Sequence, residues 1–272
     1  MAALEHRGST SLIFLVRPGV IVKHPAEVWE ESSAYTRLTQ KIANSFLVER
    51  KILEALGAHP SIVKYHGWQD KPESRRGLLL SKASHGNLQH YLEANHDNIP
   101  LSTRQRWCRQ AVESISYIHR HGVIHSDLRP DNFLVHATTP TSLDLWLCDF
   151  GGSICEKLGV DGGQLPDPGF FDPNAEWMST TATDIFSVGS VLYSIVSGHW
   201  PHRDLGPFKS AEDYRSYDER VEERFRNREY PDVDGLFGGT IILGCWTKEY
   251  SSADDVLQAL DHEIKSTQEC TS

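Results

Sequence analysis

The stretch HSDLRPDN at residues 125–132 decides how this sequence is interpreted, together with CDFG at residues 148–151. Short apolar, strand-like pieces follow the first stretch and run into the second, so a polar loop here meets a small pair of strands. One such stretch alone is a chance match in a chain of this length. Two of them in this order point to one site, and the flanking segments show what surrounds it.

The segment before this region is rich in strand signals. SLIFLV at residues 11–16, a turn at residues 17–19 and VIV ending at Lys23 predict a β-hairpin. Two further apolar runs, residues 62–68 and 77–83, predict two more strands. Between the two pairs, an apolar stripe closed by a glycine predicts a helix over residues 34–56.

Glu49 falls on the apolar stripe of that helix, at helical spacing from Phe46 and Leu53. A carboxylate that faces the core loses several kcal/mol by desolvation unless a cation pairs with it. Most glutamates lie on the surface, so an exposed position is the alternative for Glu49. Lys23, which ends an apolar strand, favours the buried interpretation because it is a candidate partner.

The segment after residue 83 is mostly helical. Ser102 and Gln105 predict a capping box for one helix, and an all-round hydrophobic helix starts at Asp184. A last amphipathic helix precedes a polar tail. We therefore predict an α+β fold with two lobes: a small antiparallel-sheet lobe with one long helix, and a larger, mostly helical lobe.

Composition excludes several classes of protein. The 272 residues carry a formal charge of −10 without a basic block, which argues against nucleic acid or an anionic membrane as the partner. The five cysteines are scattered, so neither a zinc site nor a disulfide framework is indicated. The apolar runs are too short for a signal peptide or a membrane span. We expect a monomeric intracellular protein, cytoplasmic or nuclear.

The two motifs resemble those of the eukaryotic protein-kinase superfamily, whose catalytic loop reads H-R-D-x-x-x-x-N and whose metal motif reads D-F-G. DIFSVG at residues 184–189 resembles the D-x-x-S-x-G motif of the same family. The resemblance covers nearly the whole chain. It implies one kinase domain over residues 1–266, with a small lobe and hinge at residues 1–83 and a large lobe at residues 84–272.

The resemblance also assigns chemistry to the two motifs. Asp127 would orient the acceptor hydroxyl of a protein substrate and take its proton. Asn132 and Asp149 would hold Mg²⁺, a hard cation that prefers oxygen ligands. Arg129 would neutralise the γ-phosphate of ATP during transfer. The implied cofactors are therefore ATP and Mg²⁺.

In the small lobe, the resemblance implies a nucleotide site. Lys23, oriented by Glu49, would hold the α- and β-phosphates. Leu80 would be the gatekeeper, and the backbone from Ser81 to Ala83 would meet the adenine. The apolar side chains expected to sandwich the adenine ring are Ile13, Ile21 and Leu134. Without the catalytic loop, these aliphatic residues would be taken as ordinary core.

Two internal supports follow from the resemblance. Asp184 would brace the catalytic loop near His125 by hydrogen bonds, although an Asp that opens a helix is also a common N-cap. His125 and Phe150 would stack with Leu53 and Tyr65 in a column that links the lobes. We assign His125 no role in proton transfer.

The phosphate-covering loop departs from the family pattern of three glycines. Only Gly8 precedes Ser9, Thr10 and Ser11, whose hydroxyl and backbone N–H groups are the expected phosphate donors. Ile21 replaces a small residue beside the adenine. Both departures favour weaker nucleotide binding.

The activation segment departs as well. Ser126 replaces the arginine that grips a phosphorylated residue in many kinases, and residues 154–173 contain no Ser, Thr or Tyr. We infer that phosphorylation of this segment is not the switch, which leaves Ser153 to be tested. The A-P-E motif is degraded, with residues 173–174 or Glu176 as stand-ins, and the arginine that pairs with its glutamate is absent. We expect that ion pair to be lost.

Three functions remain open from the sequence. The first is an active protein kinase that acts on serine or threonine, because Pro130-Asp131-Asn132 resembles the loop ending of such kinases. The second is a pseudokinase-like nucleotide-binding or scaffold module, which the poor glycine loop favours. The third is a small-molecule kinase, which would lack both the Phe-Gly of the metal motif and the motif at residues 184–189.

Overall fold

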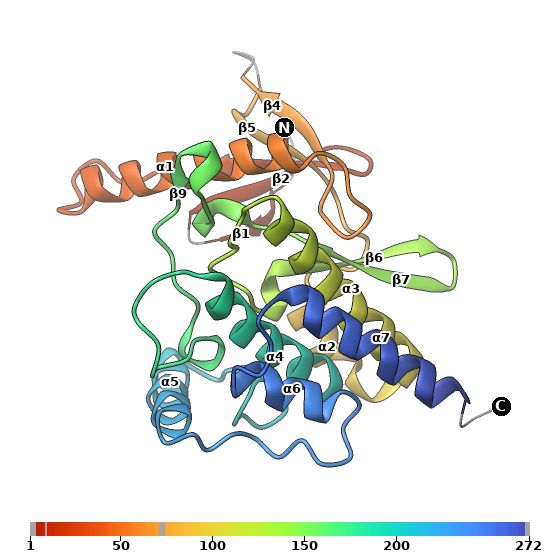
Figure 1. Ribbon diagram of the computed structural model, residues 1–272. Helices are drawn as coiled ribbons and strands as arrows, with labels where there is room; N and C mark the ends of the chain where they lie inside the picture. Colours follow the sequence, from red (N-terminus) through yellow and green to blue (C-terminus); the bar gives the residue numbers. More distant parts are fainter. Residues whose placement is uncertain (1–3, 9, 71–73, 270–272) are drawn as a thin grey trace.

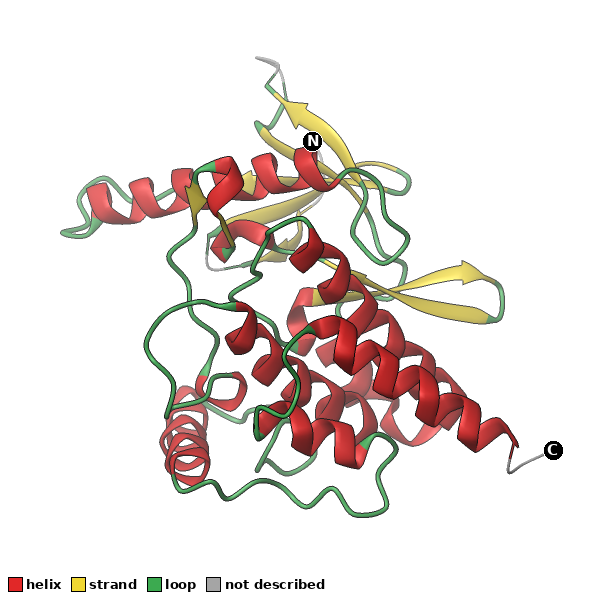
Figure 2. Cartoon of the chain, in the orientation of Figure 1, coloured by secondary structure: helices red, strands yellow, loops and turns green. Residues whose placement is uncertain are grey.

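The computed structural model describes residues 4–8, 10–70 and 74–269 (Figure 1). Ser9, predicted to bind the nucleotide, lies outside the described residues. The chain forms a sheet with one long helix in its first third and a group of helices in the remainder (Figures 1 and 2). The predicted α+β architecture with a small sheet-containing part and a larger helical part is confirmed.

The first part is a five-stranded antiparallel sheet in the order β1-β2-β3-β5-β4. Its strands are β1 (Leu4–Arg7), β2 (Ser11–Arg17), β3 (Val20–Pro25), β4 (Tyr65–Gln69) and β5 (Gly77–Ser81). The predicted hairpin is β2 with β3, and Gly19 turns it with a φ of +76°. Because β3 lies between β2 and β5, Lys23 is carried at the centre of the sheet.

The long helix α1 (Tyr35–Leu56) matches the predicted residues 34–56 closely. Its buried face includes Ile42, Phe46 and Leu53, as the apolar stripe predicts, and Glu49 lies on the same face. Gly57 ends the helix with a φ of +67°, a conformation that glycine adopts without strain. The helix therefore packs its apolar stripe against the sheet and carries one buried carboxylate inward.

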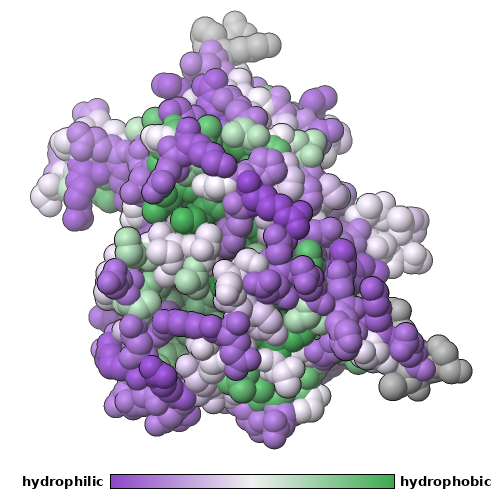
Figure 3. All heavy atoms as spheres, viewed as in Figure 1, coloured by the Kyte–Doolittle hydropathy of each residue, from purple (hydrophilic) through white to green (hydrophobic). Residues whose placement is uncertain are grey.

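The second part is mostly helical and also contains two small hairpins. The helices are α2 (Leu88–Asn95), α3 (Leu101–Arg120), α4 (Thr181–Ser197), α5 (Ala211–Arg226), α6 (Gly239–Trp246) and α7 (Ala253–Glu269). The hairpins are β6 (Phe133–Thr139) with β7 (Ser142–Leu147), and β8 (Ile154–Cys155) with β9 (Val160–Asp161). Hydrophilic side chains cover most of the face in Figure 3, and hydrophobic ones show in its hollows.

One prediction of a helix start is wrong. The helix α3 begins at Leu101 with Pro100 as its N-cap, and no side chain caps it, so Ser102 and Gln105 form no capping box. Proline fixes φ near −65° and lacks an N–H, which makes it a suitable residue at the start of a helix. The helix therefore begins before the serine can act as a cap.

The two parts share one hydrophobic core. Residues 61–63, just after α1, bond to β7: Val63 N–H donates to the Leu147 carbonyl (2.9 Å), and Leu147 N–H donates to the Ser61 carbonyl (2.8 Å). The rings of His125 and Phe150 lie 5.2 Å apart, and both Leu53 and Tyr65 belong to the same core. The segment that follows α1 is thus fixed to the part of the chain that carries the two motifs.

Asp184 fixes the catalytic loop from the inside of the helical part. Its carboxylate accepts hydrogen bonds from the backbone N–H groups of His125 (2.7 Å) and Ser126 (3.0 Å). The N-cap of α4 is Thr180, so Asp184 is not the cap of this helix and its carboxylate is directed at the loop. Asp184 is fully buried and also bonds to His119 Nε2 (2.9 Å). The predicted brace is confirmed.

No helix in the described part of the chain is long and apolar enough to cross a bilayer.

We predict that Asp184→Ala destabilises the protein by about 3 kcal/mol or more, because two buried backbone N–H groups lose their acceptor. Urea denaturation of the purified variant measures the change in the free energy of unfolding. The matched control is Glu54→Ala, which breaks the exposed pair with Arg50 and costs under about 0.5 kcal/mol. Equal effects of the two substitutions would contradict the brace.

Candidate active site

Lys23 is the centre of a buried ionic network. Its Nζ lies 2.7 Å from Glu49 Oε2 on α1 and 2.8 Å from Asp149 Oδ1 at the end of the strand β7. Lys23 is 6% exposed and Glu49 is 1% exposed, so both charges are removed from water. The sequence-based prediction that these two residues pair is confirmed. The structure adds Asp149 as a second partner of the same ammonium group.

Neighbouring charges favour the ionised forms of Lys23 and Asp149, whereas burial outweighs them at Glu49. Burial lowers the pKa of Lys23, but Asp149 and Glu49 raise it more, so the net pKa lies above its ordinary value. Burial raises the pKa of Asp149, but the neighbouring ammonium of Lys23 brings it below its usual range. For Glu49, burial prevails and raises the pKa. Asp149 therefore remains a charged carboxylate that lines the cavity.

Backbone geometry sets the direction of Asp149. It has a left-handed conformation (φ +62°), and the turn η3 (Phe150–Gly152) follows directly. Phe150 is fully buried, so the turn anchors its ring in the core. The neighbouring Cys148 donates its N–H to the carbonyl of Asn132 (2.9 Å). The metal motif and the catalytic loop are thus held side by side by main-chain contacts.

Asp127 and Asn132 face each other within the catalytic loop. Asn132 Nδ2 donates to the backbone carbonyl of Asp127 (2.6 Å) and to its Oδ2 (3.2 Å). Burial raises the pKa of Asp127 to about 7; the charges of Asp149 and Asp167 act in the same direction, while Arg129 opposes them. A carboxylate with a pKa near neutrality is suited to exchange a proton with a hydroxyl group.

A cavity of about 460 Å³ lies between the sheet and the loops of the helical part. Every residue that was predicted to bind the nucleotide, and that the structure describes, lines it. These residues are Gly8, Thr10, Ser11, Ile13, Ile21, Lys23, Leu80, Ser81, Ala83, Leu134 and Asp149. The volume falls within the range of sites for small molecules and cofactors.

Glu49, Arg129 and Asn132 line the same cavity, whereas Asp127 is reached through its bonds to Asn132. The structure also adds lining residues that the sequence gave no reason to name. Two of them are His6 from β1 and His90 from α2. Neither is part of a recognisable motif, because each reaches the cavity only through the packing of its strand or helix.

The donor set suits a magnesium ion held jointly with a polyphosphate. Asn132 and Asp149 both line the cavity, and the two bonds of Asn132 use its amide nitrogen, which leaves the amide oxygen for a cation. Within the residues described, no group of three or more His, Cys, Asp or Glu side chains is arranged to bind a metal alone. Mg²⁺ characteristically uses one or two side chains and completes its shell with phosphate and water oxygens.

Ser153 is fully buried, and its Oγ donates to the carbonyl of His125 (2.9 Å). This hydrogen bond helps to hold the backbone of the catalytic loop at His125. A kinase that phosphorylated this hydroxyl would first have to displace it from the core.

We predict that Ser153→Ala retains phosphotransfer activity per folded molecule and loses about 1 kcal/mol of stability with its buried hydrogen bond. Ser153→Asp should fold poorly, because it buries an unpaired charge. Activity assays on protein quantified by its folded fraction test both. An inactive Ser153→Ala beside an active Ser153→Asp would show that phosphorylation at this position is the switch.

An ion pair that the sequence did not predict lies at the end of the activation segment. Lys248 Nζ lies 2.7 Å from Asp172 Oδ2, and Asp172 is largely buried. The stand-ins suggested by sequence do not form this pair: Asn174 bonds to the Phe225 carbonyl (3.1 Å), and Glu176 is exposed. Lys248 and Asp172 thus form an ion pair that no motif of the sequence indicated.

We predict that Lys248→Ala lowers the free energy of unfolding by about 1–2 kcal/mol, since it leaves the carboxylate of Asp172 without its cation. Lys248→Arg preserves the charge and should remain near the wild-type value. Chemical denaturation of both variants is the measurement. A wild-type stability for Lys248→Ala would mean that the pair contributes nothing.

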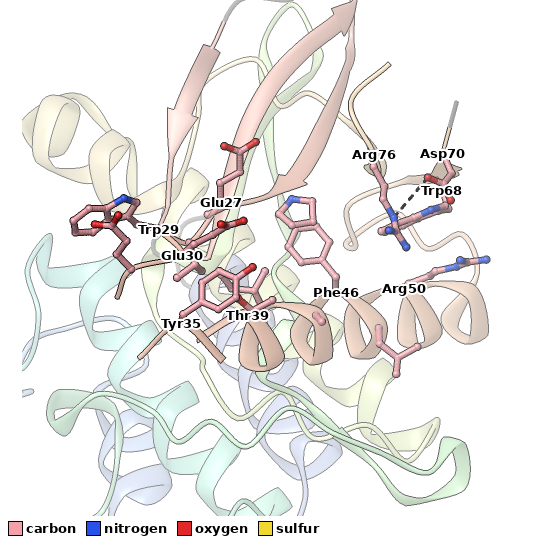
Figure 4. A pocket seen from close by; sticks show the side chains of 17 residues that line it. Glu27, Trp29, Glu30, Tyr35, Thr39, Phe46, Arg50, Trp68, Asp70 and Arg76 are labelled. Carbon is pink, nitrogen blue, oxygen red and sulfur yellow. Dashed lines mark ion pairs between the residues drawn. The ribbon is translucent and has the colours of Figure 1, made fainter. Parts of the chain in front are cut away.

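A second cavity, of about 1100 Å³, lies beside α1 next to the connection between β3 and that helix (Figure 4). Trp29, Tyr35, Phe46 and Trp68 are among its lining residues. The Phe46 ring lies 6.4 Å from the Trp68 ring, and 5.9 Å separates its centroid from Lys23 Nζ. Phe46 thus contacts both the second cavity and the ionic network, although the two cavities are separate.

Comparison with known proteins decides the family. The model of the protein kinase domain matches residues 31–234, which is most of the chain. The chain belongs to the protein kinase family. The matched region starts after Lys23, so the contribution of the first three strands to the site rests on the geometry described above.

Several protein kinases resemble the chain at low identity. Serine/threonine-protein kinase ssp1 of Schizosaccharomyces pombe is 23% identical over 64% of this chain and 28% of its own length. The probable serine/threonine-protein kinase iksA of Dictyostelium discoideum is 27% identical over 65% of this chain and 22% of its own length. Serine/threonine-protein kinase PKZ1 of Phytophthora infestans is 25% identical over 75% of this chain and 51% of its own length. The chain thus spans about half of these relatives or less.

Proposed function

We propose that this protein kinase binds ATP with Mg²⁺ in the cavity of about 460 Å³ and transfers the γ-phosphate to a serine or threonine hydroxyl of a protein. The observation that carries the proposal is the assembled network of Lys23, Glu49 and Asp149 beside Asp127 and Asn132. These five groups come from β3, α1 and the two motif loops. The choice of acceptor is supported by the names of the relatives.

Each group has a distinct role in the proposal. Lys23, held by Glu49, binds the α- and β-phosphates, while the aliphatic side chains of the cavity contact the adenine. Asn132 and Asp149 bind Mg²⁺, which offsets charge on the phosphates when it is bound. Asp127, which is bonded to Asn132, orients the acceptor hydroxyl and takes its proton.

The transfer balances without any further reactant. The acceptor hydroxyl oxygen forms a bond to the γ-phosphorus, and the bond from that phosphorus to the bridging oxygen breaks. ADP leaves with the electron pair of the broken bond, and Asp127 takes the hydroxyl proton. Preformed contacts among the five groups spare the cost of arranging them during the reaction.

We place the small lobe and hinge at residues 1–83 and the large lobe at residues 84–272, and we propose that the protein acts as a monomer inside the cell. Free thiols at all four described cysteines support a reducing compartment.

We predict that Asp127→Asn lowers phosphotransfer by about 10²–10⁴-fold while ATP binding with Mg²⁺ is retained, because the substitution removes the base and preserves the shape. Transfer of label from γ-labelled ATP to a peptide library measures activity and acceptor type together. Asp97→Asn, an exposed carboxylate on another part of the surface, is the control with wild-type activity.

Two results would overturn the proposal. Equal label transfer by the wild type and Asp127→Asn would assign the signal to a contaminant or to another site. Tight ATP binding without any transfer by the wild type would instead support a scaffold or nucleotide sensor.

A further inference from the structure

Arg129 is shared between the cavity and the activation segment. It lines the cavity, yet its Nη1 makes an ion pair of 2.5 Å with Asp167 Oδ2. Asp167 directly precedes the turn η5 (Pro168–Phe170). The sequence pattern drew no attention to Asp167, because no family motif places a carboxylate there.

We propose that Asp167 is a positioning residue that holds the guanidinium of Arg129 at the phosphate end of the cavity and away from Asp127. This inference rests on the proposed phosphotransfer function. It goes further by assigning a role to a residue outside the two motifs.

Hydrogen bonds hold Asp167 in position to pair with Arg129. Tyr214, on α5, donates its hydroxyl to the same Oδ2 atom (3.2 Å). The backbone carbonyl of Asp167 accepts the N–H of Phe170 (2.8 Å), and Ser187 Oγ on α4 donates to the Phe170 carbonyl (2.6 Å). Helix α5 therefore holds the carboxylate directly, and helix α4 fixes the turn that follows Asp167.

Charge explains why Arg129 needs such an anchor. Asp127 and Asp131 also attract its guanidinium, and Asp127 is the proposed base. An arginine that paired fully with Asp127 would keep that carboxylate from the acceptor hydroxyl. The bond to Asp167 occupies one nitrogen, and a guanidinium has five N–H donors, so others remain for a phosphate oxygen.

The pair is only partly screened by solvent. The side chains of Arg129 and Asp167 are 31% and 24% exposed. Opposite charges in direct contact and partly buried interact more strongly than an exposed surface pair. Removing the charge of Asp167 therefore releases Arg129 toward its remaining acidic neighbours.

The test measures kcat and KM for the full chain with γ-labelled ATP, Mg²⁺ and the best peptide from the library. Asp167→Asn should lower kcat by about 10-fold and leave the KM for ATP within about 3-fold, because the substitution misplaces a group that acts during transfer. Asp167→Glu should recover most of the activity. In an Arg129→Gln background, Asp167→Asn should change kcat by less than about 2-fold, since its partner is already gone.

Asp218→Asn is the matched control. Asp218 lies on α5 close enough for the charge of Asp167 to raise its pKa, in addition to the larger effect of burial, but it makes no ion pair with Arg129 in the described structure. We expect near wild-type kinetics. A similar loss of kcat in Asp218→Asn would mean that any nearby negative charge has this effect, and that the pairing of Asp167 with Arg129 is not its cause.

Two further outcomes would overturn the inference. Losses that multiply in the double variant, or a kcat of Asp167→Asn equal to that of the wild type, would show that Asp167 does not act through Arg129. An inactive wild type would refute the proposed phosphotransfer itself, so failure of the function and failure of this inference are distinguishable.

Discussion

The buried ion pair between Lys23 and Glu49 constrains the whole first part of the molecule. Two charges removed from water are tolerated only at close distance, so α1 must lie where its one inward carboxylate meets the lysine of β3. Asp149 joins the same ammonium group from the other part of the chain. The relative position of the sheet, the helix and the metal motif therefore follows from one electrostatic requirement, and the cavity is the space that this arrangement leaves.

A second constraint keeps the catalytic loop in register with that network. Asp184 binds two backbone N–H groups of the loop, and Ser153 binds a carbonyl on its other side. The activation segment is held by charges within the chain, through Asp167 with Arg129 and Asp172 with Lys248. Asp167 and Asp172 lie within residues 154–173, a segment that contains no Ser, Thr or Tyr that could be phosphorylated. The assembled site therefore depends on contacts encoded in the sequence.

Much of this arrangement could be predicted where local pattern and chemistry coincide. Glu49 lies on an apolar stripe, so its buried carboxylate needs a cation as a partner. Lys23, at the end of an apolar strand, was the candidate, and the structure shows this pair. The pair of Asp172 with Lys248 could not be predicted, because neither residue belongs to a motif and only the fold brings them together. The contact of Asp167 with Arg129 was missed because Asp167, unlike Arg129, belongs to no motif. The false capping box at Ser102 shows that a local signal fails when a neighbouring proline starts the helix earlier.

We propose that the ionic network of Lys23, Glu49 and Asp149 is a preformed site for a magnesium nucleotide. Titration calorimetry with ATP, in the presence and absence of Mg²⁺, tests it most directly on the wild type and on Lys23→Met. The account predicts binding that weakens by about 10-fold or more when either Mg²⁺ or the lysine is removed, since each loss removes a charge that faces the phosphates. Absence of binding, or an affinity indifferent to both changes, would contradict it.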